Sequence, residues 1–390
     1  MANVIFTSTG TAGDVLPLIR IGSRLKGRGH DVHLLTHAHY AGLAREAGLE
    51  FAALDNAAEY EQFVEDGPLL NTPHRIPEFM RRHYFPKVLA ECKLIEQRYR
   101  PGDTVVIARD LFDLGARLVA ERLRIPLLWI FMAPSQLLNG QLRRELFARV
   151  LAKDVNRLRE QLALGAISDW HSWLSNGGRH PALWPEWFAA PDPAWPAKVV
   201  PVGFVVDNED ESGELPDSVR ASLDAAPSPI LISGGTGTYS GIGFYGAATN
   251  ACLQLNRPGI LVTDHDRLVP ADLPVSIRHC HYLPMGKVMP RVAAVVHHGG
   301  RGTLSCALAA ATPQVVLASG ADRQDNASRL ERLGVAKYLA LPSWKPEKVA
   351  EALLRLTESV AVRNCCQDLA DRIRGSDSLA QACDVIESAV

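Results

Sequence analysis

The sequence predicts an α/β protein of two domains, each built around a parallel β-sheet. The chain has 390 residues, and one hydrophobic core rarely serves more than about 250–300 residues. Short apolar runs alternate with longer segments of helical periodicity, which is the pattern of βαβ units. A strand, a small-residue loop and a helix also follow one another twice, once from Ala2 and again from Pro229.

The composition narrows the class of protein. Hydrophobic residues make up 47% and charged residues 22%, which is ordinary for a globular enzyme. A net charge of −2 argues against general nucleic-acid binding, and no uncharged apolar stretch reaches the length of a membrane span. The seven cysteines are odd in number and lack C-x-x-C spacing, which favours free thiols. With no recognisable signal peptide, we expect a cytoplasmic enzyme.

The first half of the chain contains the expected first domain. Apolar residues recur at helical spacing between Val15 and Arg28, so this segment predicts a helix between two strands. A helix is also expected from Leu111 to Leu123. The strands predicted here are residues 2–7, 31–36, 103–108 and 125–131.

Two carboxylates follow strands in this half. Asp14 comes after the first strand and Asp110 after the strand at 103–108. Ligand sites of parallel sheets open at the carboxyl ends of the strands, so either carboxylate could face a substrate. Asp14 also stands where acidic residues commonly cap a helix. Position alone leaves both interpretations of Asp14 open.

An aromatic and basic stretch, residues 56–100, follows the second strand. Loops at this position in α/β domains commonly build a binding pocket. The alternative is an amphipathic helix that packs its own core. The residues that we assign to an acceptor pocket are Phe79, His83, Tyr84 and, from the neighbouring loop, Phe112.

The second half repeats the pattern and carries the most informative motif. The strand at 292–296 is followed by His297-His298-Gly299-Gly300-Arg301-Gly302-Thr303 and then by a helix-prone segment. Glycines at such a turn let a ligand approach the backbone, and the free N–H groups of the helix start attract an anion. We therefore predict a phosphate or diphosphate site, although two histidines that merely cap a strand end would also explain the motif. The other strands predicted here are 229–233, 259–263, 275–279 and 314–317.

One further motif bears on metal binding. Asp264-His265-Asp266 resembles the D-x-D motif with which some sugar-nucleotide enzymes bind a metal ion. We interpret it as a solvated loop, because a helix start flanked by histidines can neutralise a diphosphate without a metal ion. No metal and no cofactor are therefore expected.

Several motifs together resemble a known family. They are Gly13-Asp14-Val15 with Pro17, the H-H-G-G-x-G-T run and the turn Asp322-x-x-x-Asn326-Ala327. This combination resembles the GT-B glycosyltransferases of family 1. Within them the chain is most similar to bacterial rhamnolipid-type rhamnosyltransferases and to antibiotic and natural-product glycosyltransferases.

The resemblance implies a fold and a set of domains. It implies two Rossmann-like domains that face each other across a cleft, with a C-terminal helix that returns to the first domain. The boundaries expected are 1–205 for the acceptor-binding domain, 206–228 for a linker, 229–375 for the nucleotide-sugar domain and 376–390 for the returning helix.

The resemblance also implies roles for individual residues. Asp14 would be the catalytic base. From its place after a strand we also assign Asp110 a catalytic role, in which it orients a neighbouring group or the acceptor. Arg323 stands where the family usually has Gln, so either Gln324 serves instead or the sugar contact differs. The donor residues implied are Gly235, Thr236, His298, Gly299, Gly300, Gly302 and Thr303 for the diphosphate, Tyr282, Leu283 and Met285 for the base, and Asp322, Arg323 and Gln324 for the sugar.

The function expected is inverting, metal-independent transfer of a sugar from a UDP- or dTDP-sugar to a hydroxyl of a small hydrophobic acceptor. The enzyme would be a monomer or homodimer. Two enzymatic alternatives stay open: a rhamnosyltransferase acting on a fatty-acid acceptor and a nucleotide-sugar 2-epimerase of the same architecture. A catalytically silent partner of another glycosyltransferase is a third alternative.

Overall fold

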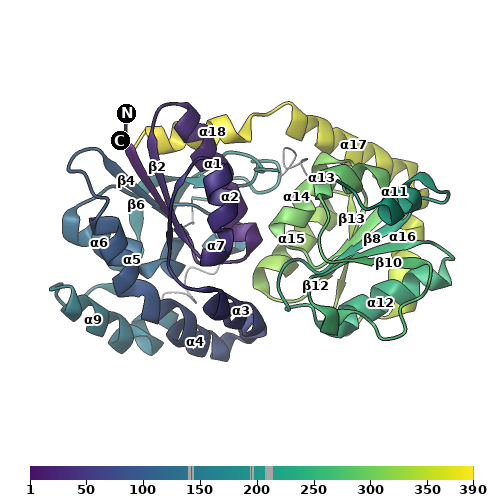
Figure 1. The fold of residues 1–390 in the computed structure, drawn as a ribbon, viewed down its shortest axis with the longest axis horizontal. Coiled ribbons are helices and arrows are strands. Elements are labelled where there is room, and N and C mark those ends of the chain that lie inside the picture. The colour runs from purple at the N-terminus through teal and green to yellow at the C-terminus, as the bar shows by residue number, and fades with distance from the viewer. Residues whose placement is uncertain (139–141, 143–144, 194, 196, 207–213, 390) are drawn as a thin grey trace. The chain divides into compact units, whose positions relative to one another are not determined.

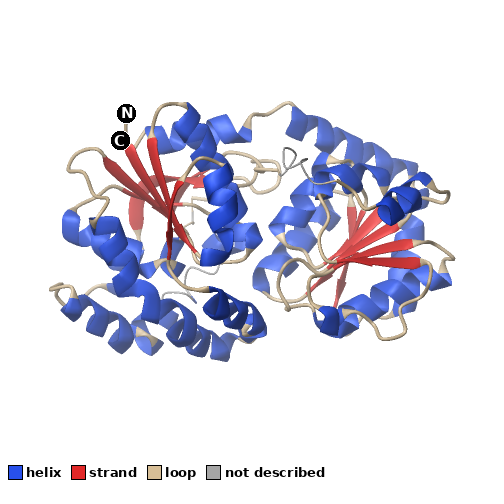
Figure 2. Cartoon of the chain, viewed as in Figure 1, coloured by secondary structure: helices blue, strands red, loops and turns tan. Residues whose placement is uncertain are grey.

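The chain forms two compact units. The computed structural model describes all residues except 139–141, 143–144, 194, 196, 207–213 and 390. One unit, here called the N-terminal unit, comprises Met1–Val205 together with Asp377–Val390. The other, the C-terminal unit, comprises Val206–Ser376. Figure 1 colours the two units by residue number. Figure 2 shows that helices flank a central sheet in each unit.

The N-terminal unit contains a five-stranded parallel sheet with the order β3-β2-β1-β4-β5. The four strands predicted from the sequence are confirmed within two residues at each end. The edge strand β3 was missed because it has only four residues, none of them buried. The strands are β1 (Asn3–Thr7), β2 (Asp31–Thr36), β3 (Glu50–Ala53), β4 (Thr104–Ala108) and β5 (Leu127–Trp129).

Helices cover this sheet, and local sequence explains the first of them. Thr11 at the N-cap and Asp14 at the third helical position form a capping box, and basic residues stand in the last turn. The helices of the unit are α1 (Ala12–Gly27), α2 (Ala41–Glu46), α3 (Ala57–Glu65), α4 (Ile76–Phe79), α5 (Val88–Glu96), α6 (Leu114–Leu123), α7 (Ser135–Leu138), α9 (Ala152–Gln161), α10 (Trp170–Leu174) and α18 (Ser378–Glu387).

A second, two-stranded sheet belongs to the same unit. Its parallel strands are β6 (Asn176–Ala182) and β7 (Ala197–Pro201), and Phe131 bridges to Ala182 at the end of the main sheet. Five prolines stand among the aromatic residues of the segment around these strands. Within it Trp184 is fully buried and donates a hydrogen bond from its indole N–H to Ala189 O. This segment therefore extends the core.

The C-terminal unit contains a six-stranded parallel sheet with the order β10-β9-β8-β11-β12-β13. The five predicted strands are confirmed, and β13 is an additional edge strand. The strands are β8 (Ile230–Ser233), β9 (Gly259–Val262), β10 (Ile277–Cys280), β11 (Ala294–His297), β12 (Gln314–Ala318) and β13 (Ala336–Ala340). The helices are α11 (Asp217–Asp224), α12 (Gly241–Gln254), α13 (Met285–Val288), α14 (Arg301–Ala309), α15 (Ala321–Arg332), α16 (Pro346–Glu358) and α17 (Val360–Arg374).

Successive residues of the central strand β8 pack into two separate cores, one on each face of the sheet. Ile230 and Ile232 join the core that includes α12 and α16, whereas Leu231 joins the core that includes α11 and α14. This alternation follows from the two-residue period of a strand. Both units are thus mixed α/β with parallel sheets, as the sequence predicted.

The segment predicted as a linker is partly helical. Residues 207–213 lie outside the described part, but α11 lies within the predicted range of 206–228. Leu215, Val219 and Leu223 are buried in the same core as Leu231. From about Leu215 onward the range predicted as a linker is thus an amphipathic helix packed on the C-terminal unit.

The last helix belongs to the N-terminal unit. Cys383 and Ile386 of α18 are fully buried, and the Cys383 thiol lies 3.8 Å from Ile21 O of α1. Arg28 at the end of α1 pairs with Asp384 and Glu387. Figure 1 shows α18 beside α1, although most of the sequence separates them.

Candidate active site

Asp14 is held at the start of α1 by two contacts. Its Oδ2 accepts the Thr11 N–H at 3.0 Å, which is the backbone half of the capping box. Its Oδ1 lies 2.7 Å from Nη1 of Arg109, and the Asp14 side chain remains 28% exposed. A carboxylate that caps a helix can still reach solvent here, so capping and a reactive role are compatible in one residue.

Arg109 is a buried cation between two carboxylates. Besides Asp14, it approaches Asp113, whose Oδ2 lies 3.6 Å from Arg109 Nε. The guanidinium also donates to Thr9 O, and the Arg109 side chain is only 7% exposed. Burial opposes its charge, but the two carboxylates hold the pKa of Arg109 well above its ordinary value.

Asp113 ties the loops after β1 and β4 together. Its Oδ1 accepts the Thr9 N–H at 3.1 Å and the Thr9 hydroxyl at 3.0 Å. Its Oδ2 accepts the Arg109 N–H at 2.8 Å. Because Thr9 and Asp14 share the loop after β1, Asp113 fixes the segment on which Asp14 stands.

Asp110, which the sequence suggested as a second catalytic residue, is 2% exposed and has a left-handed backbone with φ of 49°. Asp113, three residues later, makes the contacts toward Thr9 and Arg109 instead. Sequence reasoning missed both Arg109 and Asp113. The sequence did show that Arg109 and Asp113 directly follow a predicted strand, β4. Since β4 pairs with β1 in the sheet, the residues after β4 lie beside the loop that carries Asp14.

A buried carboxyl, Glu91 of α5, lies behind this group. It accepts hydrogen bonds from the Thr7 hydroxyl at 2.8 Å and from the Gly115 and Ala116 N–H groups at the start of α6. Burial and the nearby charge of Asp113 raise the pKa of Glu91 to about 8. Burial also raises the pKa of Asp113, against the opposing effect of Arg109, so the two buried carboxyls compete for a proton. Because Arg109 stands beside Asp113, Glu91 is the one that mainly holds the proton and Asp113 the one that mainly holds the charge.

The predicted acceptor residues form one aromatic cluster, but they differ in exposure. Phe79 is fully buried and packs against His83 and Tyr84, so it belongs to the core rather than to a surface. His83 already forms a hydrogen bond with Asp66, with 2.8 Å between His83 Nε2 and Asp66 Oδ2. The assignment of Phe79 and His83 as direct acceptor contacts is not supported by this packing. Phe112 is partly exposed.

Tyr84 and Phe112 lie nearer to Asp14. The Tyr84 hydroxyl donates to Thr9 O at 3.1 Å, and its ring lies 5.5 Å from that of Phe112. Arg109 stands 5.9 Å from the Phe112 ring centroid. Burial raises the pKa of Tyr60 and Tyr84, and the charge of Asp14 adds to it. Tyr84 and Phe112 thus contact Thr9 and Arg109, the residues that hold the Asp14 loop.

In the C-terminal unit, His297 and His298 have different environments. His297 is fully buried, and its Nδ1 accepts the Gly299 N–H at 3.1 Å while Nε2 donates to Gln314 Oε1 at 3.0 Å. Burial lowers the pKa of His297 to about 4, so this ring is neutral and structural. The alternative of a strand-capping histidine thus holds for His297.

His298 is enclosed by two of the predicted glycines. A Cβ atom at Gly235 would lie 2.5 Å from the imidazole, and one at Gly300 would lie 2.3 Å from its Nε2. The ring therefore joins the loop after β8 to the turn after β11. No hydrogen bond of good geometry reaches the buried His298 Nδ1 among the described residues, although the backbone of Ser233 is near enough to favour the charged form of the ring. Burial, followed by the charge of Arg323, lowers the pKa of His298 well below its ordinary value.

The turn next to His298 presents a helix start. Gly299 has a φ of 90°, and Gly300 is the N-cap of α14 without a side chain to bond the first amides. Gly302 and Thr303 follow in the first turn, and Thr303 is partly exposed. The Asn326 amide donates to Gly299 O at 3.0 Å, which attaches the turn to α15.

Arg323, at the position where the family pattern has Gln, is buried against an aromatic ring. It is 8% exposed, and its guanidinium lies 4.6 Å from the ring centroid of Tyr239. Its backbone O would lie 2.8 Å from a Cβ at Gly299. Its neighbours Asp322 and Gln324 are exposed. Arg323 thus contributes positive charge near His298, rather than extending into solvent.

The predicted nucleobase segment is mixed. Tyr282 is 70% exposed, whereas Leu283 is 1% exposed and packs in the core with Leu231. A base contact by the Leu283 side chain is not supported, because the core already encloses it. Met285 is partly buried. Thr236, which was predicted to contact the diphosphate, is exposed.

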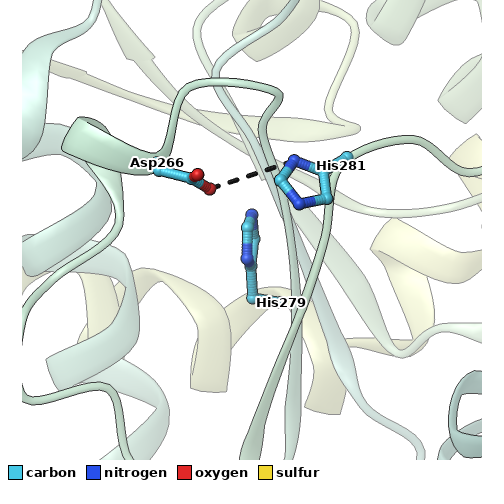
Figure 3. Close-up of side chains that lie close together, drawn as sticks. All are labelled: Asp266, His279 and His281. Atoms are coloured by element: carbon cyan, nitrogen blue, oxygen red, sulfur yellow. Dashed lines mark ion pairs between the residues drawn. The ribbon is translucent and has the colours of Figure 1, made fainter.

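One group in the described part has the composition of a metal site. Asp266, His279 and His281 offer ligand atoms within 4.8 Å of one another, and Figure 3 shows the three side chains turned toward a common space. Asp266 and His281 are exposed, and His279 Nε2 already donates to Thr263 O at 2.9 Å. The group lies at the end of β10, away from the turn at His298 along the sheet order.

The comparisons with known proteins cover both units. The family model described as "Glycosyltransferase family 28 N-terminal domain" matches residues 4–136. The model described as "Erythromycin biosynthesis protein CIII-like, C-terminal domain" matches residues 250–384. In the described part, no helix is both long enough and apolar enough to cross a membrane.

Individual relatives match over nearly the whole chain. The chain is 24% identical to 4'-demethylrebeccamycin synthase of Lentzea aerocolonigenes, with 100% of each covered. It is 24% identical to sterol 3-beta-glucosyltransferase UGT80A2 of Arabidopsis thaliana over 97% of this chain, but it spans only 64% of that relative's length. The solved glycosyltransferase VinC, in complex with dTDP, matches with a TM-score of 0.71 at 18% identity, covering 99% of both chains.

The fold, the two domain matches and the full-length relatives agree with one another. The chain is a glycosyltransferase with the GT-B fold, and it is similar over its length to natural-product glycosyltransferases of family 1.

Proposed function

We propose that the enzyme transfers a sugar, with inversion and without a metal ion, from a UDP- or dTDP-sugar to a hydroxyl of a small, largely hydrophobic natural product. The proposal rests mainly on the turn after β11. There an uncapped helix start, the Nδ1 atom of His298 and the charge of Arg323 come together in one place. The named activities of the full-length relatives support a natural-product acceptor, and VinC was solved with dTDP.

The turn suits a leaving diphosphate. Negative charge develops on the phosphate oxygen as the bond to the anomeric carbon breaks, and the amides of Gly302 and Thr303 are aligned at a positive helix end. A neutral His298 can donate one hydrogen bond to a phosphate oxygen. Arg323 adds a full positive charge nearby, which accounts for a cation at the position where the family usually has Gln. These donors can serve without a metal ion.

Asp14 suits the role of general base. It is a partly exposed carboxylate after the carboxyl end of β1, and its partner Arg109 lies against the Phe112 ring, which contacts Tyr84. Its carboxylate would take the proton of the acceptor hydroxyl as the oxygen attacks the anomeric carbon, a contribution of about 10²–10⁴-fold. The aromatic cluster favours flat, apolar acceptors.

The first experiment identifies the donor. A panel of UDP- and dTDP-sugars is scored by the melting temperature, because a ligand that binds only the folded state stabilises it by mass action. The stabilising donor is then incubated with and without a panel of phenolic and alcoholic acceptors. A glycosylated product that forms in the presence of EDTA supports the proposal, and inverted stereochemistry at the anomeric carbon completes it. Conversion of the nucleotide sugar without an acceptor would instead identify a 2-epimerase.

The second experiment tests Asp14. Asp14→Asn keeps a polar group at the third position of α1 but cannot take a proton. We expect turnover to fall at least a hundredfold, while the melting-temperature shift given by the donor stays within error of the wild type. Turnover close to that of the wild type would remove Asp14 from the chemistry.

A further inference from the structure

The group around Asp14 has an arrangement of charges that the base alone does not explain. Arg109 is buried, with Asp14 on one side at 2.7 Å and Asp113 on the other at 3.6 Å. A single partner would suffice to neutralise a buried guanidinium. With two ionised carboxylates, the group has one more negative than positive charge. Burying an unbalanced charge costs free energy, so the second carboxylate calls for an explanation.

Proton transfer provides that use. Before the reaction, Asp14 and Asp113 are both negative and share one positive Arg109. After Asp14 has taken a proton, Arg109 and Asp113 remain as a balanced pair. Without Asp113, the same step would leave a buried guanidinium with no carboxylate beside it, and the cost of that charge would oppose protonation of Asp14. The second carboxylate therefore removes an electrostatic penalty from the catalytic step.

We propose that Arg109 and Asp113 act as a positioning pair, which orients Asp14 and keeps the buried charge balanced when Asp14 becomes protonated. This inference rests on the proposed function of Asp14. In the step, the acceptor O–H bond breaks and its proton goes to Asp14, and the oxygen bonds the anomeric carbon. The bond from that carbon to the diphosphate breaks, with the electron pair remaining on the phosphate oxygen. Asp14 then returns its proton to water.

The hydrogen bonds explain how the pair could fix the orientation. Asp113 holds the Thr9 N–H and hydroxyl, and Arg109 donates to Thr9 O. Residues of the loop after β4 thus bind the loop after β1 at Thr9, which is five residues before Asp14. Arg109 contacts Oδ1 of Asp14, whereas the Thr11 N–H contacts Oδ2, so rotation of the carboxylate is restricted. A planar guanidinium can make these contacts together, but a lysine ammonium cannot match their geometry.

The other ionisable groups near Asp14 are less suited than Asp14 to take up a proton from the acceptor. The hydroxyls of Tyr60 and Tyr84 have pKa values raised by burial and, to a smaller extent, by the charge of Asp14. Glu91 lies next to Asp113 and is mostly protonated at neutral pH, for the reasons given above. Asp14 is therefore the group of this cluster that combines a negative charge with access to solvent.

The test compares kinetic constants of Asp113→Asn, Arg109→Lys and Arg109→Gln with those of the wild type and of Asp14→Asn. The substrates are the donor and the acceptor that give the highest turnover in the panels above. The matched control is the Arg81–Asp154 pair of the same unit, which is 2.9 Å long and more exposed, altered as Asp154→Asn. Melting temperatures establish that each variant is folded. Thr9→Val, which removes only one hydroxyl contact to Asp113, is the mildest variant.

For Asp113→Asn we expect kcat to fall about 10- to 100-fold with the KM of the donor unchanged, since the donor site lies in the other unit. Arg109 would then pair with Asp14 alone and hold it ionised, so the acid limb of the kcat profile should move to lower pH. The double variant Arg109→Gln/Asp113→Asn should be more active than the product of the two single effects predicts, because it removes the unbalanced cation. Asp154→Asn should leave all constants unchanged.

Three outcomes would overturn the inference. The first is a kcat within about twofold of the wild type in folded Asp113→Asn and Arg109→Gln while Asp14→Asn is inactive, which would leave the proposed function intact. The second is a pair of effects that simply multiply, with an unshifted pH profile, which indicates structural damage alone. The third is wild-type turnover of Asp14→Asn, which would reject the proposed base and this inference together.

Discussion

At the scale of single residues, the side chains of both candidate sites are positioned by glycines rather than by polar neighbours alone. A Cβ atom at Gly10 would lie 2.3 Å from Asp14 Oδ2, and one at Gly300 equally close to His298 Nε2. Real Cβ atoms essentially never approach other atoms so closely. These two glycines are therefore needed for the space they leave, and each offers a mutation that moves one side chain.

Gly10→Ala should displace the Asp14 carboxylate from its place between Thr11 and Arg109. Because proton transfer depends on the position of the base, we expect turnover to fall by at least tenfold, with a melting-temperature change of only a few degrees. Gly13→Ala is the matched control, since a Cβ there meets nothing within 4 Å. The measurement is kcat beside thermal unfolding. Equal activity of the two variants would show that the Gly10 contact is irrelevant to catalysis.

Gly300→Ala should displace the His298 imidazole and weaken donor binding. Gly302→Ala, two residues later, meets no described atom within 4 Å, and alanine suits a helix better than glycine by about 0.5–1 kcal/mol. Without ligand, we therefore expect the first variant to melt at a lower temperature than the wild type and the second at an equal or higher one. Thermal unfolding of both, with and without the nucleotide sugar, checks this. Identical melting curves would contradict the packing described for His298.

At the scale of elements, the contact between α5 and the start of α6 depends on a protonated carboxyl. Glu91 is buried against Gly115 and Ala116, and its pKa of about 8 lies above the ordinary value of 4.5. Between these two pH values the unfolded chain loses the proton while the folded chain keeps it. Folding therefore becomes less favourable as the pH rises through this window, by at most about 1.4 kcal/mol per pH unit.

The pH dependence of stability should consequently be altered by Glu91→Gln. Glutamine cannot ionise, so its unfolding free energy should decline less between pH 5 and pH 8 than that of the wild type. The variant should also be less stable at pH 5, because an amide cannot accept all three hydrogen bonds. Urea unfolding at several pH values measures both effects. The exposed Glu46→Gln is the control, and an unchanged slope in Glu91→Gln would assign the raised pKa to another group.

The sequence predicted the elements better than it predicted the site. Strands β1, β2, β4, β5, β8, β9, β11 and β12 follow from largely apolar runs, because strands buried on both faces are mostly apolar. The edge strands β3, β10 and β13 carry no such run, and of these only β10 was predicted. Similarly, the glycine-rich turn was visible in the sequence, whereas the partners of Asp14 were not. Arg109 and Asp113 are about 100 positions away, and only the pairing of β1 with β4 brings them near.

At the scale of the whole molecule, the last helix completes a unit that begins some 370 residues earlier in the chain. The contact of α18 with α1 combines buried apolar side chains with ion pairs at its edge, and the two kinds of contact should contribute differently. Exposed ion pairs are typically worth less than about 1 kcal/mol, whereas truncating a buried isoleucine costs about 2–5 kcal/mol.

Ile386→Ala should therefore destabilise the protein far more than Glu387→Gln, although Glu387 pairs with both Arg28 and His30. We expect a loss of about 2–5 kcal/mol for the first and less than about 1 kcal/mol for the second. Urea unfolding followed by circular dichroism measures both. A larger effect of Glu387→Gln would mean that charge, rather than apolar burial, holds α18 in place.

The sequence by itself predicted the fold class, the succession of the main strands along the chain and a glycine-rich turn proposed to bind an anion, because these depend on local periodicity and on glycines at a strand end. It also singled out Asp14 as a candidate, through its position after the first strand. Only the tertiary structure decided that His297 is buried and neutral, that Asp113 supports the Asp14 loop, and that Arg323 lies near His298. Those distinctions depend on burial and on contacts between loops of separate strands, and neither is encoded in the spacing of residues along the chain.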